Sequence, residues 1–235
     1  VVVLPNATPE TRVQVTARRT VPEAFREVLL VDYRFDLESD DASARMAGLG
    51  FMALLDLGPS REVSFWIPGS DPEDLELIVS NLLRVVAAYR ILATGGALLH
   101  SACVVNRGRA HLFLGHSGAG KSTLSALSAS EGMTVLSDDV NVLERRGGEL
   151  MVSRMPFAGD FGKTRLAGPD SFPLAAIYKL KKGPALLVEP LRRSEAAGIL
   201  VSCAPFVNAD ASLGARLLAV AVEVTAAAPC RSLTF

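Results

Sequence analysis

The chain has 235 residues, of which 49% are hydrophobic and 21% are charged, and its formal net charge is −1. This composition is that of a globular protein with a sizeable core, and it excludes a disordered chain. Because the net charge is close to zero, no overall field attracts nucleic acid or anionic lipid, and we expect neither as a partner. The three cysteines are far apart and show no metal-ligand spacing, so neither a zinc site nor a disulfide framework is suggested.

Two further features bear on where the chain works. No apolar stretch reaches the ~18 residues that a membrane span needs, and the first residues lack the pattern of a signal peptide. Isolated cysteines fit a reducing compartment. We therefore predict a cytoplasmic protein with no membrane association.

Residues 1–70 predict a small region rich in strands. Short apolar runs at 12–17, 28–35, 51–57 and 63–67 are separated by turn-forming clusters, such as the polar run at 38–43. Few residues in this region suggest chemistry, because Asp40 and Asp41 fit a solvated turn and Trp66 is expected to pack. We assign residues 71–235 to a second, larger domain.

A long helix opens that domain. Asp71 can cap it, Pro72 suits its first turn, and apolar residues recur at helical spacing until Gly95 and Gly96 end it. Strands and helices then alternate, which predicts an α/β fold with a mixed sheet. The expected strands are 98–105, 110–114, 133–136, 140–144, 150–154, 174–180, 185–188 and 230–235, and the expected helices are 121–130, 194–202 and 210–227, with an irregular stretch at 156–172.

Residues 115–122 read Gly-His-Ser-Gly-Ala-Gly-Lys-Ser, which is a complete phosphate-binding loop, or Walker A motif. An apolar strand leads into it and a helix follows, as the motif requires. Its glycines let successive N–H groups face a phosphate. Lys121 is expected to reach the β and γ phosphates, and the Ser122 hydroxyl to bind Mg²⁺. The predicted ligands of ATP are Gly115, Ser117, Gly118, Ala119, Gly120, Lys121, Ser122 and Thr123.

Asp138 and Asp139 follow the expected strand 133–136, only about seventeen residues after Lys121. Ligands of α/β sheets bind outside the carboxyl ends of strands, so this pair and the loop share one edge if their strands are neighbours. Two carboxylates beside a triphosphate can divide the work, one holding Mg²⁺ and one accepting a proton from an attacking hydroxyl. The alternative is a polar turn that exposes two aspartates.

His100 lies inside the apolar run that precedes the loop. A histidine in such a strand is more often a satisfied core residue than a catalyst. From spacing alone, both interpretations stay open.

The run from Leu99 to Asp139 resembles HPr kinase/phosphorylase, above all the short relatives of its catalytic domain. The resemblance rests on Leu-His-Ser-Ala at 99–102, the loop at 115–122 and Leu-Ser-Asp-Asp at 136–139. ATP-dependent phosphoenolpyruvate carboxykinase is a more distant structural cousin. By position, the resemblance implies an HPr-kinase-like fold, phosphate and Mg²⁺ binding by Lys121 and Ser122, Asp138 as the base, Asp139 as a second acidic partner and metal ligand, and His100 as a charge-stabilising neighbour.

The resemblance also leaves differences. The glycine-rich signature that follows the acidic pair in that family is not recognisable, and residues 155–165 stand in its place, with Asp160, Lys163 and Arg165 as candidates to serve the site. Phosphorylase activity is therefore not predicted. Short relatives are found beside peptide-modifying systems, which implies a peptide serine as the acceptor.

The leading prediction is an ATP- and Mg²⁺-dependent kinase that phosphorylates a hydroxyl, favouring a serine of a protein or peptide. A kinase of a small molecule such as free serine would use the same residues. A nucleotide-binding regulatory module without transfer activity is the alternative of another class. The acceptor and the oligomeric state, including a homo-oligomer, are left open by the sequence.

Overall fold

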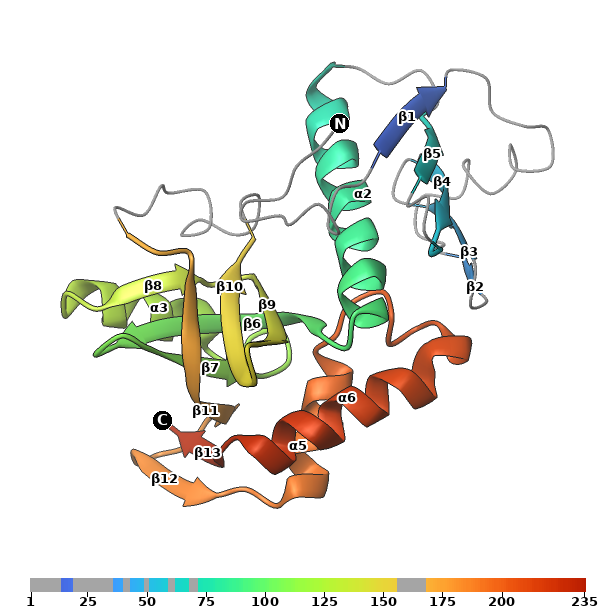
Figure 1. Cartoon of the computed structure of the whole chain (residues 1–235). Helices are drawn as coiled ribbons and strands as arrows, with labels where there is room; N and C mark the ends of the chain where they lie inside the picture. Colours follow the sequence, from blue (N-terminus) through green and yellow to red (C-terminus); the bar gives the residue numbers. More distant parts are fainter. Residues whose placement is uncertain are drawn as a thin grey trace. The chain divides into compact units, whose positions relative to one another are not determined.

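The structure is a computed structural model, and it describes residues 14–18, 36–39, 43–48, 51–58, 62–67, 72–155 and 168–235 (Figure 1). The chain divides into two compact units. The first comprises residues 1–90 with 209–213, and the second comprises residues 91–208 with 214–235. The predicted division at residue 70 stays a prediction. We describe each unit by itself.

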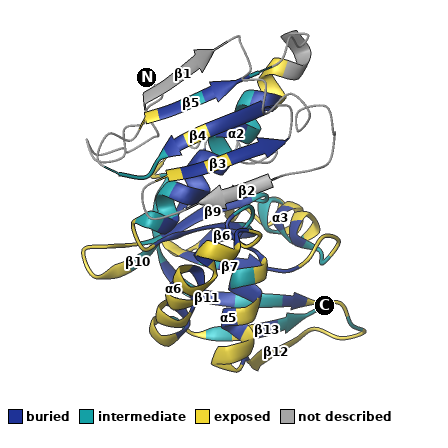
Figure 2. Cartoon of the chain, turned by 90° about the vertical axis from the view of Figure 1, so that its right-hand side faces the viewer, coloured by how far each residue is buried: buried dark blue, intermediate teal, exposed yellow. Residues whose placement is uncertain are grey.

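The first unit contains a five-stranded sheet in the order β1-β5-β4-β3-β2. Its strands are β1 (Gln14–Arg18), β2 (Asp36–Ser39), β3 (Ser43–Gly48), β4 (Phe51–Asp56) and β5 (Glu62–Trp66). β1 pairs parallel with β5, and the other pairs are antiparallel. Most of β4 and β5 is buried (Figure 2). Phe51, Met52 and Val63 are fully buried, and Trp66 packs as predicted.

The strand predictions for this unit were only partly right. β4 and β5 confirm two of the expected strands, and β1 overlaps a third, which was expected at 12–17. The polar run at 38–43 was expected to be a turn, but β2 includes Glu38 and Ser39, and β3 begins at Ser43. Pairing with β4 supplies the backbone hydrogen bonds of β3, so tertiary context overrides weak local propensity. The expected strand at 28–35 lies outside the described residues.

Helix α2 (Pro72–Ala93) confirms the long helix. Up to Arg90 it belongs to the first unit, and its apolar stripe, including Leu82 and Val85, is buried. The Tyr89 hydroxyl donates a hydrogen bond to Asp210 Oδ2 at 2.7 Å. Burial, reinforced by the Asp210 carboxylate, raises the pKa of that hydroxyl, so it remains a donor at physiological pH.

The second unit is built on an eight-stranded mixed sheet, as predicted. Its path is β10-β9-β6-β7-β11-β13-β12, and β8 also pairs with β6. The strands are β6 (Ala97–Asn106), β7 (Arg109–Leu114), β8 (Thr134–Ser137), β9 (Val140–Arg146), β10 (Glu149–Arg154), β11 (Ser171–Lys181), β12 (Leu187–Pro190) and β13 (Cys230–Thr234). The first part of β11 also pairs with β10, so β10, β9, β6, β7 and β11 form a closed ring.

Both predicted hairpins are present. β6 and β7 are joined through Arg107 and Gly108, and β9 and β10 through Gly147 and Gly148. All four of these residues have positive φ, between 50° and 88°. Two consecutive positive φ values are typical of the tight turns whose twist matches that of paired strands.

Strands β8 and β9 run along the same side of β6. Cys103 is opposite Ser137, and His100 is opposite Val140. Ser101 and Ala102 of β6 therefore face the acidic pair, and the Ser101 N–H donates to the Asp139 carbonyl at 2.8 Å. A shift of register lies just before this point, between Cys103 and Val104. The acidic pair is thus an interruption within one long ladder, and bulges of this kind often redirect side chains at functional sites.

In the described part of this unit, three α-helices accompany the sheet. α3 (Lys121–Ser130) packs against β6 and β8, while α5 (Arg193–Ser202) and α6 (Gly214–Ala227) pack against each other. One core cluster lies beneath α3 and includes Ala102, Val104 and Phe113, with Leu124 of the helix packed on it. Among the described residues, no helix is long and apolar enough to cross a membrane.

Candidate functional site

Residues 115–122, here called the glycine loop, connect β7 to α3. The loop closes on itself through a hydrogen bond from the Ala119 N–H to the His116 carbonyl at 3.1 Å. Gly120 has a φ of 101°, which side chains rarely allow. A Cβ atom on Gly115 would lie 2.6 Å from the Cβ of Ala119. The glycines are therefore required by how tightly the backbone curls.

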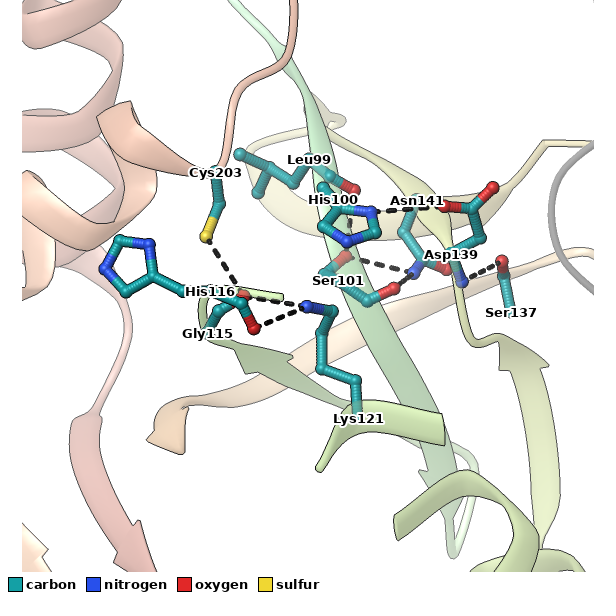
Figure 3. Close-up of polar contacts among 10 residues, drawn as sticks. All are labelled: Leu99, His100, Ser101, Gly115, His116, Lys121, Ser137, Asp139, Asn141 and Cys203. Carbon is teal, nitrogen blue, oxygen red and sulfur yellow. Dashed lines mark hydrogen bonds and ion pairs between the residues drawn. The ribbon is translucent and has the colours of Figure 1, made fainter. Parts of the chain in front are cut away.

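Lys121 is the first residue of α3, and its ammonium turns back toward the loop. Nζ donates to the Gly115 carbonyl at 2.7 Å and to the His116 carbonyl at 3.3 Å (Figure 3). The residue is 6% exposed. Burial lowers the pKa of the ammonium, and the nearby Asp139 carboxylate opposes this shift. A cation is thus held beside a loop rich in backbone N–H groups.

His100 lies on β6, the strand between β7 and β8. Because β6 runs antiparallel to both, its first residues are level with the carboxyl ends of both neighbours, and Ser101 is opposite Leu114. The His100 N–H donates to the Cys203 carbonyl at 2.7 Å. Its Nδ1 lies 3.1 Å from Asp139 Oδ1, and the imidazole is 43% exposed. His100 is therefore accessible and paired with a carboxylate.

Buried polar groups hold this part of β6 in place. Asn141 and Ser101 are both fully buried, and Asn141 Nδ2 donates to the Ser101 carbonyl at 2.9 Å and to its hydroxyl at 3.0 Å (Figure 3). The Ser137 hydroxyl accepts a hydrogen bond from the Asp139 N–H at 3.2 Å. Asn141 Oδ1 has no hydrogen-bond partner among the described residues, but the hydrogen bonds that these buried groups do make are strengthened by the low-dielectric interior. They hold the backbone of His100 and Asp139 in place.

One cavity of about 760 Å³ contains most of the predicted site. It is lined by His100, Ser117, Gly118, Gly120, Lys121, Ser122, Thr123, Asp138, Asp139, Lys182, Gly183 and Phe235. A second cavity of about 280 Å³ lies alongside, sharing His100 and Ser117 and reaching Ser202, Cys203 and Asn208. The structure thus brings His100, the acidic pair and the glycine loop to one place.

The strand order sets where each group lies along this cavity. The sequence left open whether the strands that precede the loop and the acidic pair are neighbours, and β6 in fact separates β7 from β8. Asp138 and Asp139 lie on one side of the glycine loop, with His100 between. On the other side are the carboxyl ends of β11 and β13, which are followed by Lys182 and Phe235. β11 pairs parallel with β7, and β13 pairs parallel with β11.

The residues proposed for Mg²⁺, Ser122 and Asp139, both line the cavity. Within the described ranges, no group of three or more His, Cys, Asp or Glu side chains could hold a metal ion by itself. Mg²⁺ keeps several waters and is usually held by one or two carboxylates together with substrate phosphates. The residues present therefore fit a metal that arrives with a triphosphate.

Two parts of the sequence prediction have other outcomes. Gly115 and Ala119 do not line the main cavity, although Gly115 lines the second one. Asp160, Lys163 and Arg165 lie outside the described residues. The prediction missed Ser101 and Asn141, which look like ordinary strand residues, and it gave Lys182 no role. Phe235 was counted only as the end of a strand.

Comparisons with known proteins name a family but not an activity. No curated protein matches the sequence. One similar solved structure is the HPr(Ser) kinase/phosphatase from Coxiella burnetii, with 20% identity over 40% of this chain and 72% of that chain, and a TM-score of 0.31. At this TM-score the likeness does not bear on what the chain does. The model of the family described as SynChlorMet cassette protein ScmC matches residues 67–226, which is more than half of the chain. The chain therefore belongs to the ScmC family.

Proposed function

We propose that this chain is an ATP- and Mg²⁺-dependent kinase that transfers the γ-phosphoryl group to a serine hydroxyl of a protein or peptide. The observation that carries the proposal is a single cavity lined by the glycine loop, Lys121, His100 and the two aspartates. A phosphate-binding loop alone supports only nucleotide binding. A carboxylate pair and an accessible histidine beside it supply what phosphoryl transfer needs.

Each group has a role in this proposal. Backbone N–H groups of the loop and the Lys121 ammonium bind the triphosphate. Asp138 accepts the proton of the acceptor hydroxyl as the new O–P bond forms. The bond between the γ-phosphorus and the bridging oxygen breaks, and ADP leaves with that electron pair. His100, held by Asp139, stabilises the negative charge that spreads over the transferred group.

Mg²⁺ would be held by Ser122 and Asp139 together with phosphate oxygens, and when bound it neutralises charge on the phosphates. Asp139 Oδ1 is already 3.1 Å from His100 Nδ1. In this proposal the same carboxylate serves both the histidine and the metal.

The acceptor is proposed from two considerations. The sequence resemblance implies a peptide serine from a peptide-modifying system. The family name refers to a cassette, and we infer that other products of that cassette are the first acceptors to test. The second cavity shares His100 and Ser117 with the main one, so it offers a place for an acceptor side chain beside the transferred phosphate.

The test is incubation of the protein with γ-labelled ATP, Mg²⁺ and each candidate peptide, followed by phosphosite mapping. We expect label on a serine, lost when Asp138 is changed to Asn. Labelling of metabolites such as free serine, with none of peptides, would replace the peptide acceptor by a small molecule. ATP binding without turnover or labelling of any acceptor would contradict the kinase and leave a regulatory module.

A further inference from the structure

The main cavity has a second end that the kinase chemistry does not use. Lys182, Gly183 and Phe235 line it, on the opposite side of the glycine loop from Asp138. Lys182 and Gly183 follow the carboxyl end of β11, and Phe235 follows the carboxyl end of β13. β11 pairs parallel with both β7 and β13, so the carboxyl ends of all three strands lie along one edge of the sheet. Along this edge the glycine loop lies between the acidic pair and the end formed by Lys182, Gly183 and Phe235.

The Phe235 ring is held against the glycine loop. A Cβ atom on Gly120 would lie 2.6 Å from Phe235 Cζ, so the ring contacts the loop backbone directly. The Phe235 N–H donates to the Lys181 carbonyl, and its own carbonyl accepts from the Gly183 N–H, both at 3.1 Å. The ring also packs on the core cluster that includes Phe113 and Leu180. It is only partly buried, and it lines the cavity.

The direction of a bound triphosphate follows from the order of these groups. In the proposed function its γ-phosphate faces the acidic pair, because the acceptor and the metal would be handled there. The rest of the nucleotide then extends past the loop toward β11 and β13. The first groups on that path are the aromatic ring of Phe235 and the exposed side chain of Lys182, which has no ion-pair partner within the described part of the chain.

We propose that the base of the bound nucleotide stacks on the Phe235 ring, with the Lys182 ammonium providing positive charge to the phosphates on the same side. This assignment rests on the proposed function in placing the triphosphate on the glycine loop with its γ-phosphate at the acidic pair. Every nucleobase offers a π face, and stacking on an aromatic side chain is a common means of holding it. Gly120 is then required twice, for its positive φ and for the space that the ring occupies.

Binding measured without any transfer step tests the subsite. Titration calorimetry compares MgATP with magnesium tripolyphosphate, which has the phosphates but no base, on the unmodified chain and on Phe235→Ala, Phe235→Leu and Phe235→Tyr. We expect Phe235→Ala to weaken ATP binding about tenfold to a hundredfold and to leave tripolyphosphate binding within about twofold. Phe235→Tyr should bind ATP like the unmodified chain. Phe235→Leu, which keeps apolar packing, should behave like Phe235→Ala, and thermal unfolding checks that each variant is folded.

The outcomes separate this inference from the kinase proposal. Equal weakening of ATP and tripolyphosphate by Phe235→Ala, or full ATP affinity in Phe235→Leu, would overturn the stacking assignment and leave the kinase untouched. If the unmodified chain binds neither ligand, the triphosphate site itself fails, and both proposals fail with it. If Phe235→Ala does not fold, the comparison of ATP affinity between Phe235→Leu and Phe235→Tyr tests the stacking assignment in its place.

Discussion

The two ends of the main cavity are built differently. The acidic end, formed by His100, Asp138 and Asp139, lies within or directly beside long paired strands and is backed by fully buried polar groups. The aromatic end, formed by Lys182, Gly183 and Phe235, follows the last residues of two strands. Groups that move a proton must be placed within a fraction of an ångström, whereas a stacking surface tolerates displacement. The better-supported acidic end is thus the one proposed to set the rate of transfer. The less supported aromatic end is the one proposed to set nucleotide affinity.

Replacing Lys121 should impair both ends of the cavity at once, because this residue binds the phosphates that lie between them. Its ammonium is buried against two loop carbonyls. We expect Lys121→Ala to lower transfer by about 10³-fold or more and to weaken both ATP and tripolyphosphate in calorimetry. Lys121→Arg is the matched control, and we expect it to recover little, because a guanidinium does not fit where the ammonium lies. Normal turnover by Lys121→Ala would contradict the assignment of the loop.

Asp138→Asn tests the acidic end alone. Asparagine has the same size but cannot accept the proton, so we expect kcat to fall by about 10²- to 10⁴-fold with ATP affinity within about threefold of the original. Single-turnover transfer and calorimetry on the same preparation measure the two quantities. Asp139→Asn is the control variant, and it should raise the Mg²⁺ concentration needed for activity as well as lower kcat. Equal loss of ATP affinity in Asp138→Asn would place this carboxylate on the nucleotide instead.

His100→Ala should have a smaller effect on the same end. Its ring is 3.1 Å from the Asp139 carboxylate and reaches the cavity, so its loss removes one charge-stabilising group. We expect transfer to fall by about 10²-fold, again with little change in ATP affinity. His100→Gln retains a donor and should recover part of the rate. A rate unchanged in His100→Ala would return the residue to the role of an ordinary strand side chain.

The sequence predicted α2 and most of the second unit because their signals are local. Helix caps, turn glycines and apolar periodicity placed both hairpins and α2 within a few residues. Strand order is not local, so β6 between β7 and β8 could not be read from the chain. Asn141 and Ser101 gain their importance only from facing each other across that order. The same reason explains the missed β2 and β3, whose polar ends match a turn until β3 pairs with β4 and β2 pairs with β3.

Asn141→Ala should weaken the support of the acidic end rather than its chemistry. The change removes two hydrogen bonds to Ser101 and leaves a buried carbonyl with one partner fewer. We expect the free energy of unfolding to fall by about 1–3 kcal/mol, with kcat lowered and ATP affinity retained. Chemical denaturation gives the first quantity and single-turnover transfer the second. Ser101→Ala removes only the hydroxyl and should cost less. A stability loss without any change in kcat would separate this network from the site.

The smallest effect is expected at a contact outside the cavity. Lys179 Nζ donates to Glu195 Oε1 at 2.6 Å, joining β11 to the start of α5, whose far end leads to the Cys203 carbonyl that accepts the His100 N–H. The hydrogen bond from Lys179 lowers the pKa of Glu195. A carboxyl whose folded-state pKa is lowered stabilises the fold above its unfolded-state pKa and loses that contribution as the pH falls through the folded value. Any difference in melting temperature between the unmodified chain and Glu195→Gln should therefore be present at pH 7 and vanish in acid.

Both side chains of the Lys179–Glu195 pair are substantially exposed, and exposed pairs contribute little, so transfer and ATP binding should be unchanged in Glu195→Gln. A marked loss of kcat in Glu195→Gln would mean that the position of α5 is transmitted to His100, and that the acidic end depends on more than its own buried network.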